Sequence, residues 1–166
     1  LVRDLFLFSC FTGLAYIDVA NLRREHLVTM NGKTWIMTRR KKTKVESNIL
    51  LLDIPKAIIE KYSPSTTSKD GKLFPILSNQ KMNAYLKEIA DVCGVQKRLT
   101  FHLARHTFAT MSLSKGVPME SVSKMLGHTN IKTTQIYYAR ITSKKIEHDM
   151  KQLAGKLDKF NEAMGL

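Results

Sequence analysis

Residues 99–140 read LTFHLARHTFATMSLSKGVPMESVSKMLGHTNIKTTQIYYAR, and much of the helical part of the fold can be predicted from this stretch. Its start and stop signals predict three short helices in succession. Thr100 can cap the first helix, which Gly116 ends, and Pro118 opens the second helix, which Gly127 ends. The third helix runs through the pair of tyrosines near the end of the stretch. Apolar residues at helical spacing predict that the first two helices bury one face each.

The same stretch concentrates residues suited to phosphate chemistry. His102 and Arg105 are three residues apart, which places them on one face of a helix. His128 follows in a Gly-His turn, and Tyr137 and Tyr138 close the stretch. A guanidinium offers two parallel donors to phosphate oxygens, an imidazole can donate or relay a proton, and a tyrosine hydroxyl can act as a nucleophile. Each residue alone carries little weight, and their order and spacing are what point to a phosphodiester.

The start of the chain predicts two helices. An apolar helix is predicted over residues 1–13. It ends at Gly13, because a glycine adopts the left-handed cap conformation at little cost in free energy. A second, shorter helix is predicted from about Tyr16 to Arg24, with Ile17, Ala20 and Asn21 facing inward.

A small β region follows these helices. Three segments rich in β-branched residues, Trp and Leu predict strands at residues 27–30, 34–38 and 45–52. Asn31-Gly32 is the signature of a two-residue type I′ hairpin turn. A second, wider turn over residues 39–44 holds five cations in six residues, so it is either a solvated basic turn or a phosphate-binding tip. We therefore expect a mainly α fold with a small antiparallel β-sheet.

Three more helices complete the expected fold. One begins at Pro55 and runs to about Tyr62, and a polar loop follows it. The next begins at Ser78 or Asn79 and ends at Gly94, with an inward stripe of Tyr85, Leu86, Ile89 and Val92. The last spans about Thr142 to Met164, and its apolar residues Ile146, Met150, Leu153, Leu157 and Phe160 follow heptad-like spacing. That stripe predicts packing either on the helix's own domain or on a partner molecule.

Composition narrows the class of partner. The chain has 166 residues, enough for one domain, and 27 Lys+Arg against 14 Asp+Glu give a net charge of +13. A pI near 9.9 favours a polyanionic partner, first of all nucleic acid, over a merely solvated basic surface. The acids are scattered, so we expect no metal and no cofactor. Cys10 and Cys93 lie in apolar stretches without CxxC spacing, which predicts reduced core residues and a cytoplasmic protein. No stretch predicts a signal peptide or a membrane span.

The motifs resemble those of a known family, the tyrosine recombinases or phage-type integrases. HLARH (102–106), LGH (126–128) and TTQIY (133–137) are similar to the family's HxxR, LGH and TTQxY motifs. The spacings of 23 residues from Arg to His and 9 from His to Tyr are also typical of it. TGLAYID (12–18) resembles its TGLRxSE segment, and KTKVESNILL (42–51) resembles the hairpin that carries its catalytic lysine.

The resemblance implies the family's fold and activity for residues 1–166 as one catalytic domain, with the family's N-terminal core-binding domain absent from this chain. It implies a site-specific DNA recombinase that breaks and rejoins strands through a covalent 3′-phosphotyrosine. The arginine-less TGLAxxD segment resembles integrases of Bacteroides-type mobile elements, which suggests integration or excision of such an element. The implied partners are double-stranded DNA, three further copies in a homo-tetramer on DNA, and accessory DNA-bending proteins. The isolated chain would be a monomer, and the location cytoplasmic and nucleoid-associated.

Roles for single residues also come from the resemblance. Arg105 would bind the scissile phosphate, and His102 would assist proton transfer. His128 would hydrogen-bond a non-bridging oxygen, Lys42 would protonate the leaving 5′ oxygen, and Tyr137 would be the nucleophile. Lys41 and Lys44 could serve as the general acid in place of Lys42. Asp18 would support the substrate-binding residues without touching the substrate itself, and His106 would orient its neighbours.

Two departures from the family pattern leave alternatives open. Ala15 stands where the family has its first arginine, and four other arginines could replace it: Arg23, Arg24, Arg39 and Arg40. Spacing from His128 selects Tyr137 as nucleophile, whereas the Ala-Arg that follows the doublet would select Tyr138.

Two other functions remain compatible with parts of the sequence. A non-catalytic helix-turn-helix DNA binder would explain residues 119–140 but would leave His102, Arg105 and the basic hairpin unexplained. A type IB topoisomerase would share the chemistry and relax supercoils instead of exchanging partners.

Overall fold

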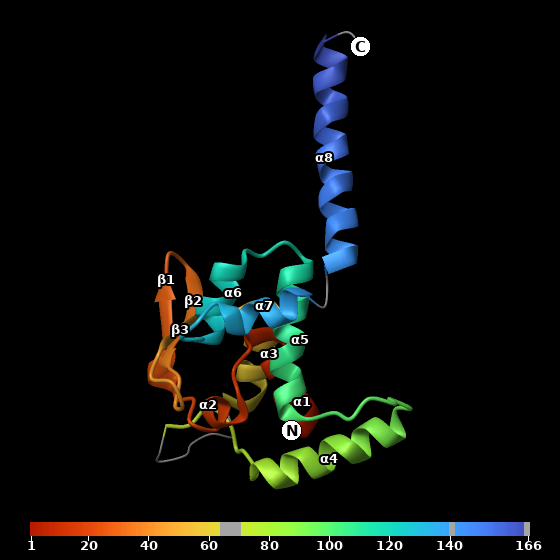
Figure 1. Ribbon diagram of the computed structural model, residues 1–166. Helices are drawn as coiled ribbons and strands as arrows, with labels where there is room; N and C mark the ends of the chain where they lie inside the picture. The colour runs from red at the N-terminus through yellow and green to blue at the C-terminus, as the bar shows by residue number, and fades with distance from the viewer. Residues whose placement is uncertain (64–70, 140–141, 165–166) are drawn as a thin grey trace.

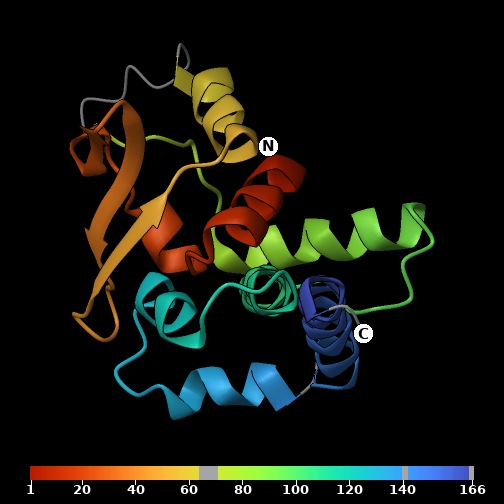
Figure 2. The ribbon, with the colours of Figure 1, turned by 90° about the horizontal axis from the view of Figure 1, so that it is seen from above.

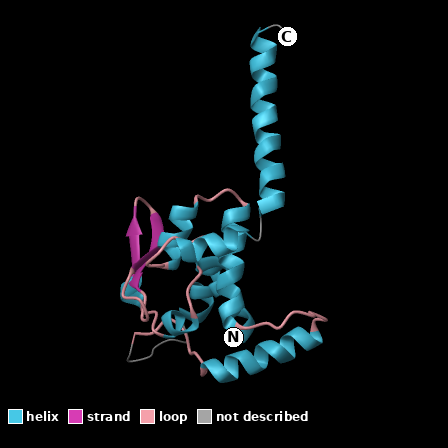
Figure 3. Ribbon diagram, viewed as in Figure 1, coloured by secondary structure: helices cyan, strands magenta, loops and turns pink. Residues whose placement is uncertain are grey.

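The computed structural model describes residues 1–63, 71–139 and 142–164 (Figure 1). In chain order its elements are α1 (Val2–Thr12), α2 (Tyr16–Ala20), the 3-10 helix η1 (Arg24–His26), β1 (Leu27–Met30), β2 (Lys33–Arg39), β3 (Glu46–Leu50), α3 (Asp53–Tyr62), α4 (Asn79–Val92), α5 (Phe101–Ser114), α6 (Met119–Leu126), α7 (Lys132–Ala139) and α8 (Thr142–Met164). Figure 3 shows helices throughout and the strands confined to one side. The predicted fold class, mainly α with a small antiparallel sheet, is confirmed.

The sheet is an antiparallel meander in the order β1-β2-β3. Trp35 of β2 pairs with Val28 on one side and with Leu50 on the other. Asn31 and Gly32 have φ angles of 51° and 70°, so the hairpin turn has the two positive φ angles that its sequence predicts. The second turn leaves β2 after Arg39 and returns at Glu46, and it carries the basic residues toward α6.

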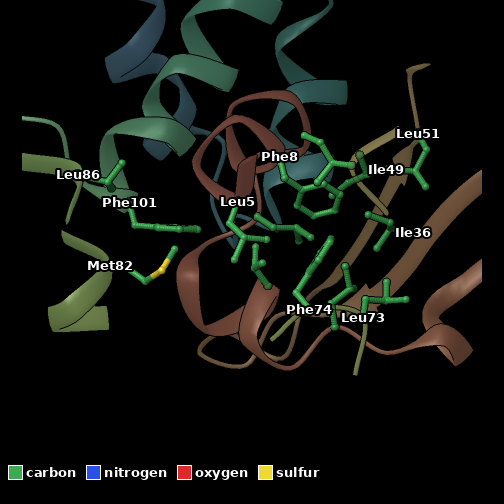
Figure 4. Packing of buried hydrophobic residues seen from close by; sticks show 14 residues of the cluster. Leu5, Phe8, Ile36, Ile49, Leu51, Leu73, Phe74, Met82, Leu86 and Phe101 are labelled. Carbon is green, nitrogen blue, oxygen red and sulfur yellow. The ribbon is translucent and has the colours of Figure 1, made fainter. Parts of the chain in front are cut away.

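The main core lies between α1, the inner face of the sheet and the helices α3, α4 and α5. Phe8 of α1 is fully buried and meets the Phe74 ring edge-on at 5.0 Å between centroids. Figure 4 shows Ile36 and Ile49 of the sheet on one side of Phe8, and Leu86 and Phe101 on the opposite side. This core fixes α1 against the sheet and α5, and therefore fixes the end of α1 at Gly13.

A second apolar cluster joins the three helices α5, α6 and α7. Phe108, Ala109 and Leu113 of α5 pack with Val122 and Leu126 of α6 and with Tyr137 of α7. The predicted caps are present, since the Thr100 side chain accepts from the Leu103 N–H and Gly127 ends α6 with a φ angle of 60°. These caps set where each helix begins and ends, and so which side chains reach the cluster.

Three expectations about burial are wrong. Helix α2 stops at Ala20, with Ile17 and Asn21 exposed and Asp18 and Val19 buried instead. The α2 segment turns its carboxylate inward because Asp18 has a cationic partner there.

The buried face of α4 also differs from the predicted stripe. Met82, Leu86 and Ala90 are buried, while Tyr85 is exposed and Val92 is 88% exposed. Helix α4 lies on the rim of the body (Figure 2), so one narrow side suffices for packing. Cys93, just after α4, is exposed rather than part of the core, whereas Cys10 is buried as expected.

Helix α8 projects away from the rest of the described chain (Figure 1). Figure 2 views α5 and α8 nearly end-on, so the two helices run in a similar direction. The apolar positions Ile146, Met150, Leu153 and Leu157 are all exposed, and the Phe160 side chain lies outside the described residues. Most of the polar loop after α3 also lies outside them. None of the described helices is long and apolar enough to cross a membrane.

Candidate active site

Arg105 is the most firmly held polar side chain of the site. The α5 register puts it beside the buried Ala104 and Phe108, and only 5% of it is exposed. Its Nη1 donates to the Gly13 carbonyl and its Nη2 to the Leu126 carbonyl, both at 2.6 Å. One guanidinium thus ties together the end of α1, the middle of α5 and the end of α6.

His128 follows the left-handed Gly127 that ends α6. Its Nδ1 lies 2.9 Å from the hydroxyl of the fully buried Thr134. If that nitrogen accepts the Thr134 proton, the neutral ring carries its own proton on Nε2, where it can donate to a substrate oxygen. The turn and the threonine together fix the direction of the imidazole.

Tyr137 lies beside both histidine-bearing elements and is 6% exposed. Its ring is nearly parallel to His128, at 8° and 6.3 Å between centroids, and meets the His106 ring at 4.9 Å. His106 in turn lies 4.4 Å from His102, measured between ring centroids. The Tyr138 side chain lies outside the described residues.

The basic turn between β2 and β3 is fastened to the same region. Thr43 Oγ1 donates to the Gly127 carbonyl at 3.2 Å, and Ser47 Oγ donates to the Met125 carbonyl. Lys42 lies on this turn with its side chain exposed. Burial is the main cause of the lowered pKa of His102, and the charge of Lys42 adds to it after those of Arg105 and Arg40, so Lys42 is near enough to act on His102 electrostatically.

Arg40 and Asp18 form a buried ion pair that sequence reasoning did not single out. Arg40 Nε lies 2.9 Å from Asp18 Oδ2, and both side chains are less than a tenth exposed. Asp18 Oδ1 accepts the Lys41 backbone N–H at 2.9 Å. By contrast, Arg39 next to it is exposed and pairs with Glu46 at 3.0 Å. The sequence signal was available only as a set of four candidate arginines.

The site is positively charged and partly buried. Burial, and then the charge of Arg40, lower the pKa of Arg105 to about 10, so the guanidinium stays protonated at neutral pH. Burial lowers the pKa of His128 to about 4, with Arg105 and Arg40 adding to the effect. Burial and the same two arginines also lower the pKa of His102. Both imidazoles are therefore neutral hydrogen-bonding groups at pH 7 in the free protein.

In the described ranges 1–63, 71–139 and 142–164, no group of three or more His, Cys, Asp or Glu residues is placed to hold a metal ion. What the arrangement offers is donors: a buried arginine, a neutral histidine and a tyrosine hydroxyl on neighbouring elements. Such a set can bind a tetrahedral anion and present a nucleophile to it.

Comparison with known proteins agrees with the geometry. Residues 2–154 match the Phage integrase family. The chain is 37% identical over 102 residues to tyrosine recombinase XerA of Saccharolobus solfataricus, an alignment that covers 61% of this chain and 34% of that one.

Solved structures share the fold. The XerH site-specific recombinase bound to a palindromic difH substrate superposes with a TM-score of 0.72 at 20% identity, covering 90% of this chain and 45% of that one. The Tn1549 transposon integrase in complex with transposon right end DNA gives 0.69 at 16% identity, over 91% of this chain and 58% of that one.

The described fold is therefore shared with the site-specific recombinase and the transposon integrase just named. The chain belongs to the phage integrase family. It spans about a third of the length of the Saccharolobus relative and about half of the solved chains.

Proposed function

We propose that this chain is the catalytic domain of a site-specific tyrosine recombinase, which breaks and rejoins DNA through a covalent 3′-phosphotyrosine. One observation carries the proposal most: the buried, doubly anchored Arg105 guanidinium, the oriented His128 imidazole and the Tyr137 phenol come from three elements and meet at one place. Family membership supports the reaction class.

The proposed step is an in-line displacement at phosphorus. The Tyr137 oxygen attacks the scissile phosphate and loses its proton, and the bond from phosphorus to the 5′ oxygen breaks. Lys42 gives a proton to the leaving oxygen. Arg105 and His128 hydrogen-bond the non-bridging oxygens, whose charge grows in the transition state. Attack of another 5′ hydroxyl on the phosphotyrosine reverses the step and joins a new partner.

His102 and His106 have different proposed tasks. His102 is exposed and neutral, so it can relay the proton of the attacking hydroxyl or of the leaving group. His106 contacts the Tyr137 ring edge-on and so restricts where the phenol can lie. It is a positioning residue rather than a substrate ligand.

The partner we propose is double-stranded DNA. A net charge of +13 supports it, as do relatives solved on DNA. Affinity should fall steeply with salt, because Lys and Arg displace condensed counterions. We also propose a homo-tetramer on DNA, a monomer in isolation, accessory DNA-bending proteins and a nucleoid location. Integration or excision of a mobile element is the proposed setting, which the transposon integrase similarity supports.

The test is capture of the covalent intermediate. A pool of nicked suicide duplexes with a randomised core is incubated with the chain, and adducts that survive boiling in detergent are counted. We expect adducts with the wild type and Tyr138→Phe, and none with Tyr137→Phe. Adducts lost only in Tyr138→Phe would move the nucleophile by one residue.

The same assay separates the competing functions. A non-catalytic helix-turn-helix protein would shift the duplexes in a gel without any adduct. A type IB topoisomerase would form the adduct and relax a supercoiled plasmid, yet transfer no strand to a second duplex.

A further inference from the structure

The loop between α1 and α2 holds an alanine where the resembled family has its first arginine. Ala15 is the N-cap of α2, two residues after Gly13, whose carbonyl accepts from Arg105. A methyl group cannot donate to a phosphate oxygen. A second guanidinium at this site has to come from another segment of the chain.

Arg40 reaches this place from the basic turn. It follows β2 directly, and its side chain is 7% exposed. The stem passes against Gly127, since a Cβ on that glycine would lie 2.5 Å from Arg40 Cγ. Arg40 therefore crosses the same turn that presents His128 and that accepts a hydrogen bond from Arg105 at Leu126.

Asp18 holds Arg40 near the position of the missing side chain. The carboxylate lies one helical turn after Ala15, and its Oδ2 is 2.9 Å from Arg40 Nε. Its Oδ1 accepts from the Lys41 backbone at 2.9 Å, so one carboxylate fixes both the guanidinium and the chain that bears it. This arrangement orients Arg40 without occupying all of its donors.

One donor of Arg40 is buried and unused. Within the described part of the chain, Nε and Nη1 both lack a hydrogen-bond partner; Nε has the ion-pair contact with Asp18, and no such contact is found for Nη1. A buried guanidinium donor without an acceptor is destabilising, and the charge of the same carboxylate, Asp18, acts on both buried arginines, Arg40 and Arg105. After burial, the charge of Arg40 helps to lower the pKa of Arg105, His128 and His102, so its field reaches both predicted phosphate ligands and the predicted proton-transfer residue. A bound anion would satisfy the donor and offset the charge.

We propose that Arg40 is a second phosphate-binding arginine of this site, in place of the side chain that Ala15 lacks. That the anion is a scissile phosphodiester rests on the proposed function; that Arg40 binds a tetrahedral anion does not. The other three candidates are exposed: Arg39 pairs with Glu46, Arg24 donates to Ser63, and Arg23 caps η1.

Inorganic sulfate is the first probe, titrated at constant ionic strength and followed through the arginine Nε–H signals by NMR. The key variant is Arg40→Met combined with Asp18→Asn, which removes both charges and keeps an acceptor for the Lys41 N–H. We expect its sulfate affinity to fall roughly tenfold or more, as loss of a charged hydrogen bond predicts. Arg39→Ala, at the adjacent position, is the matched control, and its sulfate affinity should stay within about twofold of that of the wild type.

Sulfate binding as tight in the double variant as in the wild type would overturn the proposal and leave Arg40 as a mere counter-ion of Asp18. Arg40→Lys keeps the charge and the ion pair but lacks the planar fork, so it covers the case in which the double variant fails to fold. It should bind sulfate severalfold more weakly, and unchanged affinity would equally count against Arg40.

The suicide-duplex assay separates this inference from the proposed function. Adducts formed equally well by the wild type and the double variant would refute the role of Arg40 while upholding the recombinase chemistry. Arg40-dependent sulfate binding in a chain that makes no adduct would uphold the anion site and refute the chemistry.

Discussion

The Nη2 of Arg105 donates to the carbonyl of Leu126 across 21 residues of sequence, at 2.6 Å. The residue proposed to bind the scissile phosphate therefore also stabilises the fold, because it links α5 to the ends of α1 and α6. Its two guanidinium nitrogens already hold two backbone oxygens in place, so the direction of the remaining donors is fixed before any substrate arrives. Such preorganisation lowers the reorganisation that catalysis would otherwise need.

Arg105→Ala should therefore unfold more easily as well as lose cleavage. Two buried carbonyls lose their donors, and each unsatisfied group costs about 1–3 kcal/mol. We expect the free energy of unfolding, measured by urea denaturation, to fall by about 2–6 kcal/mol. The exposed Arg39→Ala should change it by less than about 1 kcal/mol. Equal effects of the two variants would show that the buried hydrogen bonds contribute little.

Gly127→Ala should disturb the site through space. The new Cβ would lie 2.5 Å from Arg40 Cγ, in a backbone with a φ angle of 60°. Gly116→Ala is the matched control, because its φ angle is also positive but no atom lies within 4 Å of the added Cβ. Backbone strain alone predicts about 1–2 kcal/mol for the control. Thermal melting should show a clearly larger loss for Gly127→Ala, and the same loss in both would argue against the close passage of Arg40.

Stability should fall between pH 6.5 and pH 4 because of His128. Its pKa is about 4 in the folded protein and near 6.5 when unfolded, so the unfolded chain binds more protons in this window. The unfolding free energy therefore rises with pH across it and is flat above it. Urea midpoints of His128→Gln should depend less on pH than those of the wild type. The hydrogen bond from Lys61 holds the pKa of the Asp4 carboxyl well below its usual range. The contribution of Asp4 to the pH dependence of stability therefore lies at lower pH than that of His128.

Lys42→Ala should slow cleavage by removing the acid that protonates the leaving oxygen. A duplex with a 5′-phosphorothiolate at the scissile position needs no such proton and should restore the rate of adduct formation. Lys41→Ala, which leaves the backbone N–H to Asp18 intact, is the control and should need no rescue. Rescue of Lys41→Ala instead would transfer the role to that lysine.

Removal of α8 should leave the melting temperature of the body nearly unchanged. The apolar residues Ile146, Met150, Leu153 and Leu157 are about half exposed and bury little against the rest of the chain. Truncation after Thr142 tests this by calorimetry. A fall of many degrees would show that α8 packs on its own domain in solution.

Local signals predicted most of the framework. The caps at Thr100 and Gly127, the Asn31-Gly32 turn and the span of the last helix are set by neighbouring residues, and each is present as expected. The spacing of the motifs also brought Arg105, His128 and Tyr137 to one place, because short helices between tight turns leave few ways to arrange them.

What the sequence did not predict depends on contacts between distant segments. Arg40 and Arg39 are adjacent and chemically identical, and only the packing of the turn against Asp18 and Gly127 buries one and exposes the other. The stripe of α4 was misplaced for the same kind of reason. Periodicity identifies the faces of a helix that could be buried. Which of them is buried depends on the distant segment that packs against the helix.

The anchoring of Arg105 on backbone oxygens has an evolutionary consequence. Every amino acid supplies a carbonyl, so substitutions at the residues that accept from Arg105 do not by themselves delete the acceptors. The Arg40–Asp18 ion pair is different, because it connects two side chains and is lost when either residue is substituted. One arginine of the site is thus buffered against mutation of its partners, and the other depends on a matched pair that has to change together.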